Sequence, residues 1–155
     1  MKKTRMLAVV ALGLVVTACD RGAGTPMTPS PSPQARVDDP KVLALGKEVF
    51  MTHCARCHGQ QAEGAPDWRT PNAQGHYPPP PLNGSGHAWH HPKAMLRQVI
   101  REGSPPGPQA RMPAWKDRLS EQEIQAVIAW FQSLWPEDVY QAWQQMDRRG
   151  GHRNQ

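Results

Sequence analysis

The densest group of chemically capable residues is the stretch M-T-H-C-A-R-C-H-G-Q, residues 51–60. It holds Cys54 and Cys57, with His58 directly after them, and the chain has one other cysteine, Cys19. Two thiols at this spacing serve three kinds of chemistry in proteins. They form a redox dithiol, contribute half of a zinc site, or attach a larger group covalently.

The surroundings of Cys54 and Cys57 argue against the first two. A redox pair of this kind normally lies where a strand leads into a helix, and no strand pattern precedes Cys54. A structural zinc site needs about four ligands, whereas the sequence has no second cysteine pair and its distant histidines lack the usual spacing. C-A-R-C-H is instead the sequence that attaches a c-type haem. We therefore predict thioether bonds from Cys54 and Cys57 to the haem, with His58 as an iron ligand.

The segment from Pro40 to Cys54 is predicted to be the helix that leads into this motif. Asp38 or Asp39 provides the N-cap, and Pro40 occupies the first helical position, where its missing N–H costs nothing. The apolar side chains recur on one face of the helix, at Val42, Leu45, Val49 and Phe50.

Two further helices are predicted nearer the C-terminus. One covers about residues 92–102 and ends at Gly103, with Leu96, Val99 and Ile100 facing inward. The other starts after Ser120, which forms a capping box with Glu123, and it ends before Pro136. Its apolar stripe consists of Ile124, Val127, Ile128, Phe131, Leu134 and Trp135.

The remaining segments are mostly irregular. A weaker pattern predicts a short helix over residues 137–148, followed by a disordered tail to residue 155. Residues 59–91 and 103–119 are long loops rich in proline and glycine, and no alternating run long enough for a strand is present. Loops of this length are uncommon in a compact domain unless they bind or wrap something.

With these elements in order, residues 38–136 resemble a class I cytochrome c. Members of that family have a helix leading into Cys-x-x-Cys-His, a Pro-x-Leu-x-Gly turn, a middle helix, a loop with a distal methionine and a C-terminal helix. The resemblance implies an all-α, small cytochrome c fold. Three to four helices and long loops would wrap one covalently bound haem c.

The resemblance also implies specific contacts. The turn is P-P-L-N-G, beginning at Pro80, and the Pro80 carbonyl would accept a hydrogen bond from Nδ1–H of His58 and so orient the imidazole. Gly46 and Phe50 would meet Trp130 where the first and last helices cross, because glycine permits a close backbone approach.

The sixth iron ligand is expected to be a thioether or a second imidazole. Met27, Met51, Met95 and Met146 lie in the tether, before the motif, in a helix and near the C-terminus. Met112 lies instead in R-M-P-A-W, an irregular segment just before the last predicted helix of the domain. M-P-A followed by an aromatic residue matches the distal signature of the family, which implies Met112 as the axial ligand.

One histidine-rich loop is not part of the family pattern. H-A-W-H-H contains His87, His90 and His91, and His76 lies nearby. These side chains either bind copper or another divalent ion, supply a haem ligand, or form a polar surface loop, which is the alternative we favour.

Trp89 and Trp115 are candidates to cover the haem or to bond a propionate, and the sequence does not choose between them. His53 is expected to be a neighbour of the haem motif rather than a ligand.

The N-terminus has the pattern of an exported lipoprotein. A basic start precedes the apolar run of residues 6–18, which is shorter than the roughly 20 residues a spanning helix needs. It ends in V-T-A-C, which resembles a lipobox with Cys19 as the lipidated residue. We expect a signal peptide at 1–18, a Pro-rich tether at 19–37, the cytochrome domain at 38–136 and a C-terminal extension at 137–155. Asp20 resembles an inner-membrane retention signal, so we expect a periplasm-facing lipid anchor, with the inner membrane favoured over the outer.

The charge of the chain gives no case for nucleic-acid binding. The formal charge is +5, and removing the three basic residues of the signal peptide leaves about +2. We therefore expect a membrane-anchored electron carrier, not an enzyme, that meets redox proteins transiently. The alternatives are a haem enzyme module, such as a peroxidase or oxidase subunit, and a copper-binding or sensing protein that uses the histidine loop.

Overall fold

The computed structural model describes residues 35–104 and 112–151. Within these residues the chain forms helices and loops and contains no strand, which confirms the all-α prediction. The expected signal peptide, and the tether as far as residue 34, lie outside the described residues. In chain order the elements are α1 (Pro40–Val49), the π-helical turn η1 (Phe50–Cys54), α2 (Ala55–His58), the 3₁₀ turn η2 (Ala88–His90), α3 (Lys93–Glu102), α4 (Glu121–Ser133) and α5 (Glu137–Gly151).

The first helical run begins as predicted but changes its winding before the haem motif. Asp39 is the N-cap, and its side chain accepts a hydrogen bond of 2.8 Å from the backbone N–H of Lys41. The run was predicted as one regular helix to Cys54, whereas the structure has a π turn over Phe50–Cys54. The backbone N–H of Ala55 reaches back five residues to the carbonyl of Phe50, and this longer ring defines the π turn.

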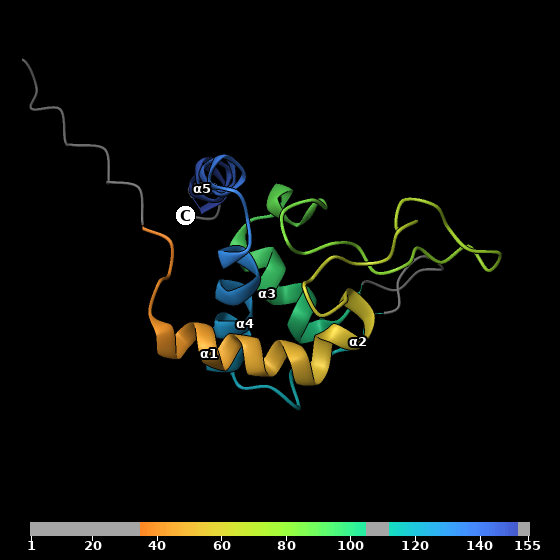
Figure 1. Cartoon of the computed structure of the whole chain (residues 1–155), viewed down its shortest axis with the longest axis horizontal. Helices are drawn as coiled ribbons and strands as arrows, with labels where there is room; N and C mark the ends of the chain where they lie inside the picture. Colours follow the sequence, from red (N-terminus) through yellow and green to blue (C-terminus); the bar gives the residue numbers. More distant parts are fainter. Residues whose placement is uncertain (1–34, 105–111, 152–155) are drawn as a thin grey trace, which may run out of the picture. The chain divides into compact units, whose positions relative to one another are not determined.

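A close crossing of α1 and α4 forms the centre of the domain (Figure 1). A Cβ added at Gly46 would collide with the backbone of Ala126 and lie 2.8 Å from the Cβ of Trp130. The rings of Phe50 and Trp130 have centres 4.5 Å apart and are tilted by 42°. The predicted contact of Gly46 and Phe50 with α4 is therefore present, and glycine is required there by space.

The ends of α3 and α4 follow the sequence signals. Pro92 caps α3 and Gly103 follows its last residue. Ser120 and Glu123 form the predicted capping box, with each backbone N–H bonded to the other side chain. Such a box contributes about 1 kcal/mol to a helix. The predicted end of the last helix was wrong by two residues: α4 ends at Ser133. Leu134 and Trp135 of the predicted stripe lie past it, with Leu134 39% exposed and Trp135 buried.

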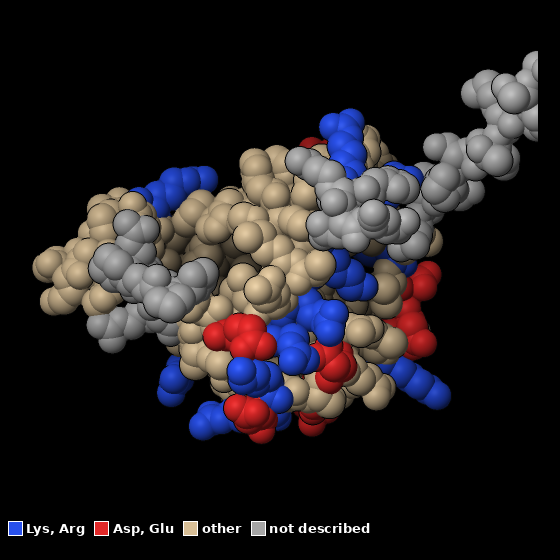
Figure 2. Space-filling model, turned by 180° about the vertical axis from the view of Figure 1, so that it is seen from behind, with Lys and Arg blue, Asp and Glu red and all other residues tan. Residues whose placement is uncertain are grey.

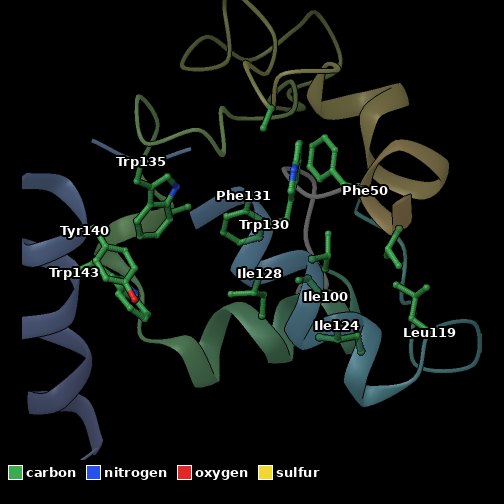
Figure 3. Packing of buried hydrophobic residues seen from close by; sticks show 14 residues of the cluster. Phe50, Ile100, Leu119, Ile124, Ile128, Trp130, Phe131, Trp135, Tyr140 and Trp143 are labelled. Atoms are coloured by element: carbon green, nitrogen blue, oxygen red, sulfur yellow. The ribbon is translucent and has the colours of Figure 1, made fainter. Parts of the chain in front are cut away.

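The C-terminal extension is longer than predicted. The helix was expected to end near Arg148 and to give way to a disordered tail, but α5 continues to Gly151. Tyr140 and Trp143 are buried, and the ring of Trp143 stands edge-on to Trp135 at 5.8 Å between centres. Figure 3 shows this aromatic group joining α5 to the end of α4. Burial of these large rings anchors the helix to the rest of the domain.

The packing therefore runs past the expected domain boundaries at residues 38 and 136. Arg36 donates hydrogen bonds to the carbonyls of Ser133 and Trp135, at 3.3 and 2.8 Å, and forms an ion pair with Glu137. Its guanidinium also lies 4.2 Å from the centre of the Tyr140 ring. No helix in the described part of the chain has the length and apolarity to cross a bilayer.

Candidate haem site

The cysteines of the motif lie at the end of the first helical run. Cys54 is the last residue of η1 and Cys57 lies within α2, three positions further on, so both face the same side of the helical run. Cys54 is half-buried, Cys57 is exposed, and both are free thiols. One thiol is thus held against the core while the other is accessible.

The electrostatic state of Cys54 does not suit thiol–disulfide exchange. Burial, and secondarily the charge of a Cys57 thiolate, raise the pKa of Cys54 to about 11. Redox dithiols work through a cysteine whose pKa is lowered, so that the thiolate is present near neutral pH. Cys54 therefore lacks the lowered pKa that the attacking cysteine of a redox dithiol has.

The imidazole of His58 is oriented by the turn that begins at Pro80. Its Nδ1 lies 2.9 Å from the Pro80 carbonyl oxygen, which is the contact that the family resemblance implies. A carbonyl only accepts, so Nδ1 carries the proton and Nε2 keeps its electron pair for a metal. Burial lowers the pKa of His58, and the Pro80 bond opposes this shift. The site therefore presents a neutral, oriented imidazole.

Met112 is joined to Ser104 by two hydrogen bonds. Its carbonyl accepts a hydrogen bond of 3.0 Å from the N–H of Ser104, and its own N–H lies 3.2 Å from the Ser104 hydroxyl. Residues 105–111 between them are outside the described residues. The Met112 side chain is partly buried and packs against the hydrophobic core.

Several apolar side chains pack against the core and keep some surface exposed. They come from η1, α2, the turn after Pro80, η2, α3 and the Met112 segment. Examples are Cys54, Ala55, Leu82, Trp89, Leu96, Met112 and Trp115. Two thiols, an oriented imidazole and a thioether, together with such apolar side chains, are the donor set and lining that a haem c needs. The residues present fit the cofactor.

The comparison with known families agrees with this geometry. The family described as cytochrome c oxidase, cbb3-type, subunit III matches residues 42–131, more than half of the chain. The chain belongs to this cbb3-type subunit III family. It is a class I c-type cytochrome of the electron-transfer type, and its cofactor is haem c.

A relative of the chain agrees with the family match. The Cbb3-type cytochrome c oxidase subunit FixP of Bradyrhizobium sp. (strain ORS 278) is 30% identical over 91 residues. These residues are 59% of this chain and 27% of that protein, so the cbb3-type chain spans about a quarter of its relative's length. No solved structure matches the chain. The family match ends at residue 131, so α5 lies outside it.

The side chains of the histidine loop make pairwise ring contacts. His87 and His91 lie edge to face, 5.5 Å apart between ring centres, and the rings of His90 and Trp89 are tilted by 40° with centres 3.8 Å apart. The described residues, which include all four histidines of this region, contain no group of three or more His, Cys, Asp or Glu side chains placed to hold a metal ion.

Several contacts between distant segments were missed by sequence reasoning. His53 lies against Trp115, which is three residues beyond Met112. Trp68 stacks on His87 across the long loop. Asp147 of α5 accepts a hydrogen bond of 2.7 Å from the backbone N–H of Lys93, at the start of α3. These contacts join segments far apart in sequence, and no local pattern signals them.

Proposed function

We propose that this chain is a single-haem electron carrier in which Cys54 and Cys57 hold the haem and His58 and Met112 bind its iron. When bound, the haem supplies a one-electron Fe(III)/Fe(II) couple. The observation that carries the proposal is the 2.9 Å contact between His58 Nδ1 and the Pro80 carbonyl, next to the Cys-x-x-Cys-His motif. The sequence has one such motif, which supports one haem.

The roles of the protein residues follow from their chemistry. The thioethers from Cys54 and Cys57 prevent loss of the haem. The Pro80 carbonyl holds the His58 ring in one tautomer and raises its donor strength. The Met112 thioether, a neutral ligand, favours the ferrous state relative to a second imidazole. With both axial positions filled, no open position is left for a substrate, which supports an electron carrier rather than an enzyme.

Absorption spectra of the purified holoprotein test the ligand assignment. Wild-type ferric protein should be low-spin and show the far-red charge-transfer band of methionine ligation. Met112→Ala should lose this band, whereas Met95→Ala should keep it, because Met95 is 46% exposed on α3. A band that persists in Met112→Ala, or a high-spin wild-type spectrum, would refute the assignment and favour a haem enzyme module.

Attachment is tested separately by covalent haem staining in denaturing gels. Cys54→Ser and Cys57→Ser should each lose one thioether, and the double variant should lose the stain entirely. Full staining in the double variant would show that the haem is attached elsewhere.

We also propose that Cys19 is lipidated after removal of residues 1–18 and that the following Pro-rich segment tethers the domain to the periplasmic face of a membrane. The V-T-A-C sequence and the short apolar run support this. Cys19→Ser should release the protein into the soluble periplasmic fraction, and metabolic labelling with palmitate should disappear in the same variant. Unchanged membrane attachment in Cys19→Ser would exclude the anchor.

The partners proposed for this chain are the redox proteins of a respiratory chain, met in transient encounters. The relative FixP is named as a subunit of a cbb3-type cytochrome c oxidase, which supports a partner of the terminal-oxidase class. Reduced holoprotein should be oxidised by membranes that contain such an oxidase. No faster oxidation than in oxidase-free membranes would exclude this partner.

A further inference from the structure

A cleft of about 310 Å³ lies beside the contact between His58 and Pro80. The long loop between α2 and α3 supplies its lining residues, Trp68, Arg69, Tyr77, Pro78, Pro80 and His87. Pro80 is therefore both a wall of the cleft and the residue that orients the proposed iron ligand. A molecule bound in this cleft would contact Pro80, whose carbonyl is bonded to His58.

Aromatic contacts hold the walls in place. The rings of Trp68 and His87 are stacked, with centres 5.3 Å apart and planes within 24°. The guanidinium of Arg69 lies 4.1 Å from the centre of the Trp68 ring. Tyr77 keeps 43% of its surface exposed. Walls that are already ordered reduce the entropy lost when a partner binds.

Helix α5, which lies outside the family match, is hydrogen-bonded to the segment that follows this loop. The indole N–H of Trp143 donates a hydrogen bond of 3.0 Å to the carbonyl of His91, whose ring meets that of His87. Asp147 accepts from the N–H of Lys93, two residues further on. Helix α5 therefore fixes the segment from which His87 enters the cleft.

The cleft carries positive charge without a compensating acid. Its lining contains one guanidinium and one imidazole and no carboxylate. Among residues 35–104 and 112–151, no ion pair includes Arg69. By contrast, Arg97, Arg101 and Lys116 form ion pairs with Glu102 and Glu121. Figure 2 shows both signs of charge interspersed on one face of the molecule.

His87 is affected by burial and, to a smaller extent, by its basic neighbours. Burial lowers the pKa of His87, and His91, His90 and Arg69 lower it further. These basic neighbours disfavour another cation and would favour an anion in the same space.

We propose that this cleft binds a carboxylate side chain on the surface of a redox partner protein. Arg69 supplies the charged contact, the neutral imidazole of His87 offers a hydrogen bond, and Trp68 and Tyr77 supply the aromatic contacts. Trp, Tyr and Arg are the residues that most often dominate the binding energy of protein interfaces. The proposal rests on the proposed function, because it makes the cleft the site where a partner meets the haem-bearing part of the domain.

The test is a titration of the ferrous holoprotein with an end-blocked hexaglutamate peptide, followed through the indole N–H signals in NMR spectra. Trp68→Phe identifies the Trp68 signal. That signal should shift most, in a saturable way that weakens as salt is added. Arg69→Gln should bind about fivefold more weakly, the effect of losing an exposed ion pair worth about 1 kcal/mol. Arg97→Gln is the matched control and should bind as wild type, because Arg97 is paired with Glu121.

Three results would overturn the proposal: equal affinity in Arg69→Gln, shifts centred away from Trp68, or equal binding of hexalysine. Arg69-dependent binding to phosphatidylglycerol vesicles without peptide binding would also overturn it, in favour of a lipid surface. The absorption spectrum of each sample reports the axial ligands independently. An anomalous spectrum with intact peptide binding would count against the proposed function and leave the cleft standing.

Discussion

The imidazole of His53 and the indole of Trp115 lie ring to ring, 5.1 Å apart between centres and tilted by 56°. His53 is in the π turn that leads into the haem motif, and Trp115 follows Met112 by three residues. The backbone N–H of Trp115 is bonded to the carbonyls of Ile100 and Arg101 at the end of α3. This contact joins the segments that carry the two proposed axial ligands.

Replacing Trp115 by alanine should loosen the Met112 segment. Losing a half-buried indole should destabilise the fold by about 2 kcal/mol, less than for a fully buried Trp. External imidazole should then displace Met112 from ferric iron more readily than in wild type. Trp115→Phe keeps a ring against His53 and should retain most of the wild-type resistance. Equal imidazole affinity in all three proteins would show that the contact does not hold the Met112 segment.

Gly64 controls the backbone at Pro80. It has a φ of +68°, and a Cβ there would lie 2.6 Å from the carbonyl carbon of Pro80. Gly64→Ala should displace that carbonyl and weaken its bond to His58, which makes the imidazole a poorer donor to ferric iron. A loss of about 1 kcal/mol would raise the reduction potential by about 40 mV in a redox titration.

Gly75→Ala is the matched control for this measurement. Gly75 has a similar φ of +76°, but no atom lies within 4 Å of an added Cβ. It should cost stability through backbone strain and leave the potential unchanged. An equal shift in both variants would mean that strain, rather than the Pro80 carbonyl, sets the potential.

Gly46→Ala should strongly destabilise the domain. The new methyl group would collide with the Ala126 backbone, which cannot move without separating α1 from α4. We expect a loss of about 3 kcal/mol, the upper end for an overpacked core, measured by denaturant unfolding. Ala44→Val adds bulk on the exposed side of the same helix and should change stability by less than about 0.5 kcal/mol. Similar losses in both variants would argue against a steric requirement at Gly46.

Arg36 should contribute to the stability of the domain although it precedes the expected boundary. Arg36→Gln removes the bonds to the Ser133 and Trp135 carbonyls and the contact with Tyr140. We expect a loss of about 1–2 kcal/mol in urea unfolding, because two carbonyl acceptors lose a charged donor. Lys41→Gln, on the exposed start of α1, is the control and should be nearly neutral. No loss in Arg36→Gln would place the boundary after residue 36.

The histidine loop should make the fold sensitive to mild acid. Burial, followed by His91, His90 and Arg69, lowers the pKa of His87 below its ordinary value of 6.5. Its contribution to stability is therefore present above pH 6.5 and is lost as the pH falls through the folded pKa. Unfolding midpoints at pH 7.5 and pH 5 should differ less in His87→Gln than in wild type. An unchanged difference would remove His87 from the acid response.

The features that could be predicted from sequence are those set by neighbours in the chain. The attachment motif needs only the spacing of Cys54, Cys57 and His58, which a single helical turn fixes. The caps at Asp39 and Ser120 are likewise local, since a side chain bonds a backbone N–H two or three residues away. The contact between His58 and Pro80 was inferred from a family resemblance, because 22 residues separate the partners.

Only the tertiary structure decided the remaining features, because they depend on which distant segments meet. The π turn interrupts a sequence that reads as a regular helix. The packing of α5 comes from the buried Tyr140 and Trp143, whose partners Trp135 and His91 lie on other segments. The cleft combines Trp68 and Arg69 with His87 across a long loop that has no periodicity to read. The short-range hydrogen bonds could be predicted from the sequence, whereas the long-range contacts that shape the surface near the proposed haem site could not.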